Sequence, residues 1–183
     1  QALARLSRQK WPGDRANAGV LDLGTGSGAI AVTLALESPQ SRVTACDVSS
    51  AALETARASA ASLGANVEFL ESNWYAALRD RRFDLIVSNP PYVAGNDTHL
   101  SQGDLRFEPH TALTDGSADG LQSIRIIIGG APAHLQPGGW LLFEHGYDQA
   151  DACRELLLKH GFNDPICIRD LAGIPRVAGG QIR

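Results

Sequence analysis

Short apolar runs of strand length alternate along the chain with longer stretches of helix-forming composition. The runs are apolar almost throughout, as in strands that are buried on both faces of a parallel sheet. The predicted strands are 20–23, 42–46, 67–70, 83–87, 140–143, 166–169 and 176–181. The predicted helices are 29–36, 49–63, 121–135 and 150–160. Ser49 or Ser50 is the expected N-cap of the second helix, and Gly64 is its expected end.

This alternation predicts the fold class. Strand–helix–strand units favour a mainly parallel sheet with helices on both faces. The last two strands follow each other without a helix, so we expect them to pair antiparallel at one edge. The prediction is a doubly wound α/β fold with a seven-stranded, mainly parallel sheet and an antiparallel edge strand. Residues 93–120 form one long irregular segment, which in a compact domain is more often functional than a plain connection.

Composition and charge narrow the class of function. The 183 residues carry 16 Lys and Arg against 20 Asp and Glu, a formal net charge of −4, which disfavours binding to nucleic acid through its phosphates. No stretch approaches the roughly 18 to 20 apolar residues of a membrane helix. Three distant cysteines without a Cys-x-x-Cys pair indicate buried thiols in a reducing, cytoplasmic compartment, and the scattered histidines indicate no metal site.

A glycine-rich loop comes directly after the first predicted strand. It consists of Gly24, Thr25, Gly26, Ser27 and Gly28. Glycines let the backbone turn tightly and approach a ligand, and Asp47 at the end of the second strand can accept hydrogen bonds from the two hydroxyls of a ribose. These features predict a site for a cofactor that contains a nucleoside. The dinucleotide fingerprint fits Gly24, Gly26, Ala29 and Asp47 as well, and a structural turn is a third interpretation.

A second motif follows the fourth predicted strand, which in a sheet of this kind lies beside the first. The motif consists of Asn89, Pro90, Pro91 and Tyr92. The prolines fix φ and remove two backbone donors, so the carbonyls of Asn89 and Pro90 are free to accept hydrogen bonds from a ligand. The Asn89 amide adds an acceptor and a donor, and Tyr92 offers a flat wall. The motif is therefore suited to a planar NH₂ group, either of an amide or of a base.

This motif resembles the signature of S-adenosylmethionine-dependent methyltransferases that modify planar NH₂ groups, which is Asn-Pro-Pro-Tyr or Asp-Pro-Pro-Tyr. The resemblance implies a class I, Rossmann-like methyltransferase fold. It also implies that the glycine loop holds the methionine part of the cofactor and that Asp47 holds its ribose. Asn89 is expected to serve both the cofactor and catalysis. Pro90 is expected to be catalytic with it, and Pro91 and Tyr92 to complete the substrate site.

Three further stretches resemble the HemK/PrmC family of N5-glutamine methyltransferases. They are 72–78, then 101–109 followed by 112–113 and 119–121, and finally 143–146, and the resemblance spans roughly 20–178. It implies that Trp74 packs near the adenine, although the chain has Asn73 where the family commonly has Asp. Within the family the stretch 102–109 resembles the branch acting on peptide chain release factors, which present a Gln in a Gly-Gly-Gln motif, more than the branch acting on a large-subunit ribosomal protein. Residues 1–19 are then expected to be the end of a helical N-terminal region, followed by a methyltransferase domain over 20–183.

Several alternatives stay open. The rival functions are a DNA or RNA amino-group methyltransferase, acting on adenine N6 or guanine N2, and a non-catalytic nucleotide-binding module. The long segment, with Asp97, Asp104, Arg106 and Glu108, is expected to order over the substrate Gln.

Two local features are also unresolved by the sequence. Glu144 and His145 either serve the site or satisfy each other. The tripeptide Gly179-Gly180-Gln181 matches the substrate motif, and we interpret it as a chance similarity within the expected edge strand.

Overall fold

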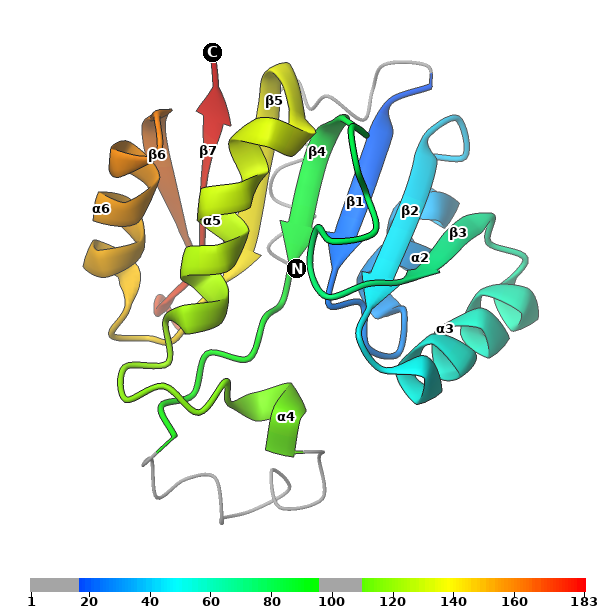
Figure 1. The fold of residues 1–183 in the computed structure, drawn as a ribbon, viewed down its shortest axis with the longest axis horizontal. Coiled ribbons are helices and arrows are strands. Elements are labelled where there is room, and N and C mark those ends of the chain that lie inside the picture. The colour runs from blue at the N-terminus through cyan, green and yellow to red at the C-terminus, as the bar shows by residue number, and fades with distance from the viewer. Residues whose placement is uncertain (1–16, 96–109) are drawn as a thin grey trace.

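The computed structural model describes residues 17–95 and 110–183, and within them strands and helices alternate as the sequence predicts (Figure 1). The strands are β1 Gly19–Leu23, β2 Arg42–Asp47, β3 Val67–Glu71, β4 Phe83–Ser88, β5 Leu135–Glu144, β6 Phe162–Arg169 and β7 Pro175–Ile182. The helices are α2 Ala29–Glu37, α3 Ser50–Leu63, α4 His110–Leu113, α5 Gln122–His134 and α6 Ala150–Lys159.

The seven strands form one sheet in the order β3-β2-β1-β4-β5-β7-β6. The first five strands in this sheet order, β3 to β5, pair in parallel, and β7 is antiparallel to both of its neighbours. This confirms the doubly wound, mainly parallel sheet and the antiparallel pairing of the last two strands. The placement of the last strand at an edge was wrong, because β7 lies between β5 and β6 and leaves β6 at the edge.

The glycine pair in β7 has a packing role in this interior position. A Cβ at Gly179 would overlap the carbonyl oxygen of Leu141, and one at Gly180 would lie 2.9 Å from the Cβ of Phe162. Gln181 donates from Nε2 to the carbonyl of Gly138 at 2.7 Å. The match to the substrate tripeptide therefore has an explanation within the sheet itself, which requires two residues without side chains here.

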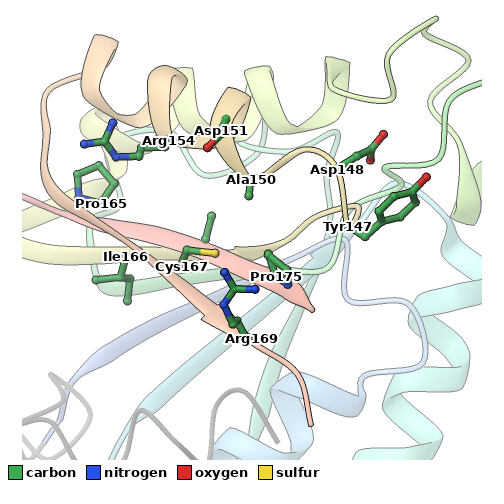
Figure 2. Close-up of a pocket in the computed structure, with 11 residues that line it drawn as sticks. Tyr147, Asp148, Ala150, Asp151, Arg154, Pro165, Ile166, Cys167, Arg169 and Pro175 are labelled. Atoms are coloured by element: carbon green, nitrogen blue, oxygen red, sulfur yellow. The ribbon is translucent and has the colours of Figure 1, made fainter. Parts of the chain in front are cut away.

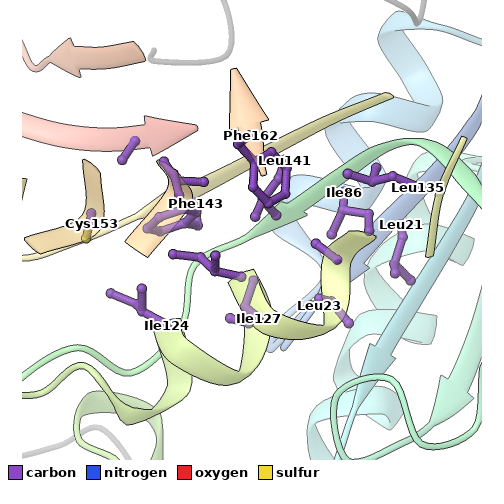
Figure 3. Packing of buried hydrophobic residues seen from close by; sticks show 14 of the residues in the cluster. Leu21, Leu23, Ile86, Ile124, Ile127, Leu135, Leu141, Phe143, Cys153 and Phe162 are labelled. Carbon is purple, nitrogen blue, oxygen red and sulfur yellow. The ribbon is translucent and has the colours of Figure 1, made fainter. Parts of the chain in front are cut away.

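Helices cover both faces of the sheet. On one face α2 packs on the strands, with α3 beside it (Figure 1). On the other face α5 and α6 cover the larger core, which contains Ile124 and Ile127 of α5 together with Leu21 and Leu141 of the sheet (Figure 3). The strands that carry the glycine loop and Asp47 are thus buried on both sides, which fixes their carboxyl ends in place.

The connection from β3 to β4 contains turns where the other crossovers carry helices. Tyr75 in this connection donates its hydroxyl to the carbonyl of Ile127 at 2.8 Å, and its ring stacks on His134 with 4.7 Å between centroids. A Cβ at Gly130 would lie 2.5 Å from the Tyr75 ring, so the glycine makes room for it on α5. These contacts attach the connection to the α5 face of the sheet.

Most element ends agree with local signals. Ser49 caps α3, since its Oγ accepts from Ala52 N at 3.2 Å, and Gly64 ends the helix with φ of 69°. The expected end of the helix predicted over 121–135 was wrong by one residue at Leu135, because α5 ends at His134 and β5 begins at Leu135. Leu135 pairs with β4, and the ladder then shifts register before the strand resumes, which accommodates the Pro-Gly-Gly stretch at 137–139.

The thiols and the helices bear on two further expectations. Cys46 and Cys153 are buried, as predicted, whereas Cys167 on the edge strand β6 is exposed, so the prediction was wrong for this thiol. None of the helices in the described part of the chain is long and apolar enough to cross a membrane.

Candidate functional site

The candidate site lies where β1, β2 and β4 end side by side. Leu23 pairs with both Cys46 and Ser88, so the residues that follow these strands emerge at one edge of the sheet. The Ser88 hydroxyl donates to the carbonyl of Leu23 at 2.7 Å and ties the end of β4 to that of β1. The structure therefore brings together the glycine loop, Asp47 and Asn89, as the sequence predicts.

Asp47 is bound directly to the glycine loop. Its Oδ2 accepts from Gly26 N at 2.9 Å, and its Oδ1 accepts from Ser49 N at 2.9 Å. A carboxylate offers about four acceptor positions, so both oxygens can take one further hydrogen bond each. The side chain is half-buried, and it is held in a fixed orientation in which it can accept from a pair of neighbouring hydroxyls.

The glycine loop adopts a backbone that favours glycine. Gly24, Gly26 and Gly28 have φ of 68°, 56° and 84°. A Cβ at Gly28 would lie 3.0 Å from that of Ala56, so this glycine also lets α2 pack against α3. At Gly26, by contrast, a Cβ would meet nothing within 4 Å, which leaves this part of the loop open to a ligand.

Thr25 turns its side chain into the protein and not toward the open side of the loop. Its hydroxyl donates to Asp22 Oδ2 at 2.7 Å, and its backbone N–H donates to the carbonyl of Cys46 at 3.0 Å. Ser27, in contrast, is exposed. Of the two hydroxyl residues predicted for the cofactor site, Thr25 therefore binds the loop to the protein interior, whereas Ser27 lies on the solvent-accessible side.

Asp22 is a residue of this site that the sequence reasoning missed. It lies in β1 with only 1% of its surface exposed, and its Oδ2 also accepts from Ala31 N at 3.1 Å. Oδ1 has no hydrogen-bond partner among the described residues. Burial, together with the nearby Asp47 charge, raises the pKa of Asp22 to about 6. A carboxylate inside an otherwise apolar strand was the available signal.

Trp74, which the resemblance places near the adenine, lies beside the glycine loop. A Cβ at Gly24 would be 3.5 Å from the Cζ3 atom of the indole, so the ring contacts the loop where the glycine leaves room. Trp74 is half-buried against the core and has φ of 49°. Its carbonyl accepts from the Ser72 hydroxyl at 2.7 Å, which holds this unusual backbone.

The motif after β4 combines the exposed amide of Asn89 with the buried ring of Pro90. Asn89 is exposed and Pro90 is buried, whereas Pro91 and Tyr92 are half-buried. The Tyr92 hydroxyl donates to Glu144 Oε1 at 2.7 Å. Glu144 therefore serves the motif, which the sequence left open.

His145 has a separate environment. It is fully buried, and its Nδ1 lies 2.7 Å from the carbonyl of Gly146. Burial lowers the pKa of the imidazole. Its Nε2 has no partner within the described parts of the chain. The idea that Glu144 and His145 satisfy each other is not needed, since each has a different partner.

A second residue missed from the sequence is Gln149, which lies between β5 and α6. Its amide contacts the carbonyl of Tyr92 and is buried. No local pattern marks it, because it is 57 residues from its partner. The part of the long loop at 96–109, including the stretch from Ser101 to Pro109, lies outside the described residues, as do residues 1–16.

A cavity of about 440 Å³ lies elsewhere, between α6 and the β6–β7 hairpin. Its lining includes Arg154, Cys167 and Arg169, with Tyr147 and Asp148 at one end (Figure 2). None of the predicted site residues lines it. Among the described residues, no group of three or more His, Cys, Asp or Glu side chains can hold a metal ion.

Two curated relatives are similar to most of this chain. The release factor glutamine methyltransferase of Bordetella pertussis is 56% identical over 94% of this chain, and that of Neisseria gonorrhoeae is 55% identical over 90%. The chain spans 64% and 61% of the length of these two relatives. The resemblance to glutamine methyltransferases indicated by the motifs is thereby confirmed.

Solved structures and a family model agree on the fold. A 16S rRNA methyltransferase from T. thermophilus, solved in complex with AdoMet and guanosine, has a TM-score of 0.70 at 22% identity and covers 100% of this chain and 42% of its own. A methyltransferase from Pyrococcus furiosus has a TM-score of 0.70 at 20% identity, with 98% and 82% covered. The fold is that of class I methyltransferases. The methyltransferase small domain model matches residues 6–107, more than half of the chain. By this match and by its sheet, the chain belongs to the methyltransferase small domain family.

Proposed function

We infer that this chain transfers a methyl group from S-adenosylmethionine to the side-chain amide nitrogen of the Gln in the Gly-Gly-Gln motif of peptide chain release factors. One observation carries the inference. An Asn-Pro-Pro-Tyr motif stands at the same sheet edge as the glycine loop and Asp47, in a chain 56% identical to a protein named release factor glutamine methyltransferase. We expect the protein to act in the cytoplasm, where release factors work.

The residues present fit the proposed cofactor. The open backbone at Gly26 suits the methionine part of the cofactor. The Asp47 carboxylate suits the ribose diol, because each of its oxygens accepts one hydrogen bond from the protein and can accept another. Trp74 offers an apolar ring beside the loop. Gly24, Thr25, Ser27 and Gly28 complete the loop. When bound, S-adenosylmethionine supplies an electrophilic methyl group on a positively charged sulfur.

The protein residues address the weak nucleophile. An amide nitrogen reacts poorly because its lone pair is delocalised into the carbonyl. In the proposed mechanism Asn89 Oδ1 and the Pro90 carbonyl each accept a hydrogen bond from one N–H group of the substrate amide, and they favour a pyramidal nitrogen. Their hydrogen bonds strengthen as the N–CH₃ bond forms, the S–CH₃ bond breaks and the nitrogen becomes positive, so they stabilise the transition state more than the ground state. One proton then leaves the nitrogen, which restores a neutral amide.

Positioning supplies the other part of the proposed rate enhancement. Pro91 and Tyr92 form a rigid wall that orients the planar amide, since proline has a fixed φ and the Tyr92 ring is held by Glu144. Holding the nitrogen in line with the transferred methyl group removes the entropy loss of finding that geometry in solution.

A labelled methyl-transfer assay tests this function. The chain should label a release factor but not the variant in which the Gly-Gly-Gln glutamine is Ala, and equal labelling of both would refute the proposal. Labelling of DNA or RNA instead of the protein would favour the amino-group methyltransferase of nucleic acids. The formal net charge of −4 makes that second outcome the less expected one.

Two substitutions separate chemistry from binding. Asn89→Ala should lower kcat far more than it weakens S-adenosylhomocysteine binding, whereas Asp47→Ala should weaken that binding directly. Asn66→Ala is a matched control, because Asn66 is exposed before β3, away from the site edge. Unchanged activity in Asn89→Ala together with lost binding in Asp47→Ala would indicate a nucleotide-binding module without this chemistry.

A further inference from the structure

The Asn-Pro-Pro-Tyr motif cannot be held in place by the backbone donors of its own prolines. Pro90 and Pro91 have no N–H, so the segment must be fixed through its carbonyls and side chains. Asn89 at its start is exposed, which makes the amide geometry sensitive to how the following backbone is anchored. The anchoring contacts of Tyr92 are therefore informative about how the acceptor pair is oriented.

Tyr92 is held at both ends by residues 144–149, which run from the end of β5 to the start of α6. Its hydroxyl donates to Glu144, the last residue of β5, and its carbonyl accepts from Gln149 Nε2 at 3.0 Å. The ring therefore has a fixed direction, and so has the peptide group that follows it. Both anchors come from one short connection, 144–149, opposite the motif.

The Gln149 amide binds three different segments at once. One N–H goes to Tyr92, and the other goes to the carbonyl of Asp119 at 2.9 Å. Its Oε1 accepts from Gly146 N at 2.8 Å. Gln149 is 8% exposed, so its amide is largely shielded from water and the three bonds hold it in one orientation.

The backbone around this amide is built for close approach. A Cβ at Gly120 would overlap the carbonyl oxygen of Tyr92, so only glycine lets the 115–121 turn come this near. Directly after the motif, Val93 N donates to the carbonyl of Leu113 at 3.0 Å, which adds a second backbone contact to the segment before the turn. Gln149 thus lies at the centre of a contact between the motif, the turn and the β5–α6 connection.

We propose that Gln149 is a positioning residue for methyl transfer, which acts through Tyr92 to orient the acceptor pair formed by Asn89 Oδ1 and the Pro90 carbonyl. This proposal rests on the proposed function. Gln149 makes no contact with the glycine loop among the bonds described, so its loss changes the reaction geometry and leaves cofactor binding in place. A misplacement of about 1 Å at a reacting group lowers rates by about 100-fold.

Two variants of Gln149 test the proposal. Gln149→Glu keeps the length and the acceptor for Gly146, but it turns a pair of donors into an acceptor facing two carbonyls. Gln149→Met keeps the length and removes all three bonds without a charge, so it remains informative where the Glu variant folds poorly. Gln136→Glu and Gln136→Met are the matched controls, since Gln136 is exposed at the opposite end of β5.

Two readouts distinguish positioning from loss of stability. For both Gln149 variants kcat toward the release factor should fall about 10- to 100-fold at saturating substrate, with the Kd for S-adenosylhomocysteine within about twofold of the unmodified chain. In chains labelled with 3-fluorotyrosine, the Tyr92 fluorine resonance, assigned by its loss in Tyr92→Phe, should shift in both variants. The Gln136 controls should change neither quantity.

The contrary outcomes are equally distinct. An unchanged kcat, or a Kd that weakens in proportion to the loss of kcat, would overturn the positioning role. An unmodified chain that fails to methylate any release factor would refute the proposed function instead. In that case the fluorine spectrum alone decides, and a Tyr92 resonance unmoved by both Gln149 variants would overturn this proposal as well.

Discussion

Replacing Asp22 with Asn should remove a pH-dependent part of the stability of this chain. The Asp22 carboxyl is buried in β1, and burial raises its pKa from 3.8 to about 6. Between these values the folded chain holds the proton that the unfolded chain has released. The free energy of unfolding therefore falls as the pH rises from about 4 to about 6, and it stays at the lower level above that range.

The size of this effect follows from the shift. About two pKa units at 1.36 kcal/mol each give roughly 3 kcal/mol between the acid and the neutral plateau. In Asp22→Asn the amide oxygen can replace Oδ2 and accept from Thr25 and Ala31. The NH₂ group then replaces Oδ1, which has no partner among the described residues, so the variant imitates the protonated carboxyl.

Urea unfolding followed by circular dichroism, repeated from about pH 4 to about pH 8, measures the difference between the two proteins. The variant should match the parent chain near pH 4 and exceed it by roughly 3 kcal/mol above about pH 7. Asp80→Asn is the control, because Asp80 is exposed in the turn before β4. A difference that does not change with pH would refute the reasoning, as would a parent chain that is the more stable at pH 8.

Three further outcomes are expected. Gly26→Ala should lower the free energy of unfolding by about 1–2 kcal/mol because of backbone strain. Gly28→Ala should lower it by more, because only at this position does the new Cβ press on α3. Urea unfolding measures both changes, and a larger loss for Gly26→Ala would contradict the packing. Gly120→Ala should lower the melting temperature and the methyl-transfer rate together, since its Cβ would displace the Tyr92 carbonyl, and a variant with parental values of both would be inconsistent with this contact. A thiol reagent should modify Cys167 quickly in the folded chain and all three cysteines in denaturant, whereas fast reaction of a second thiol before unfolding would show that burial is incomplete.

Local patterns predicted most of the fold because most of the sheet is built from adjacent strand–helix units. The apolar runs located the strands, and Ser49 and Gly64 marked the ends of α3 through bonds that span only a few residues. The general order of such sheets then placed the motif beginning at Asn89 beside the glycine loop. Local patterns, together with this strand order, therefore locate the edge of the sheet that carries the candidate site.

Other features depend on contacts between distant segments, and local patterns do not encode them. The position of β7 depends on which strand it pairs with, and its alternation of residues is the same at an edge or inside the sheet. Gln149 resembles any polar residue before a helix, and its role depends on a carbonyl 57 residues away. Asp22 was passed over because its strand otherwise looks like plain core, although a carboxyl there is a signal in itself.

The insertion of β7 between β5 and β6 makes the order of these strands in the sheet differ from their order of synthesis. β1 to β4, with the glycine loop, Asp47 and the motif that follows β4, are synthesised before the strands of the other part of the sheet. β6 emerges before β7 and has no sheet partner until β7 arrives, and β7 also completes the ladder of β5. The backbone N–H of His145 donates to Arg176 at the start of that last strand. The connection that anchors Tyr92 is therefore bound to the sheet through this hydrogen bond only once the final strand is in place.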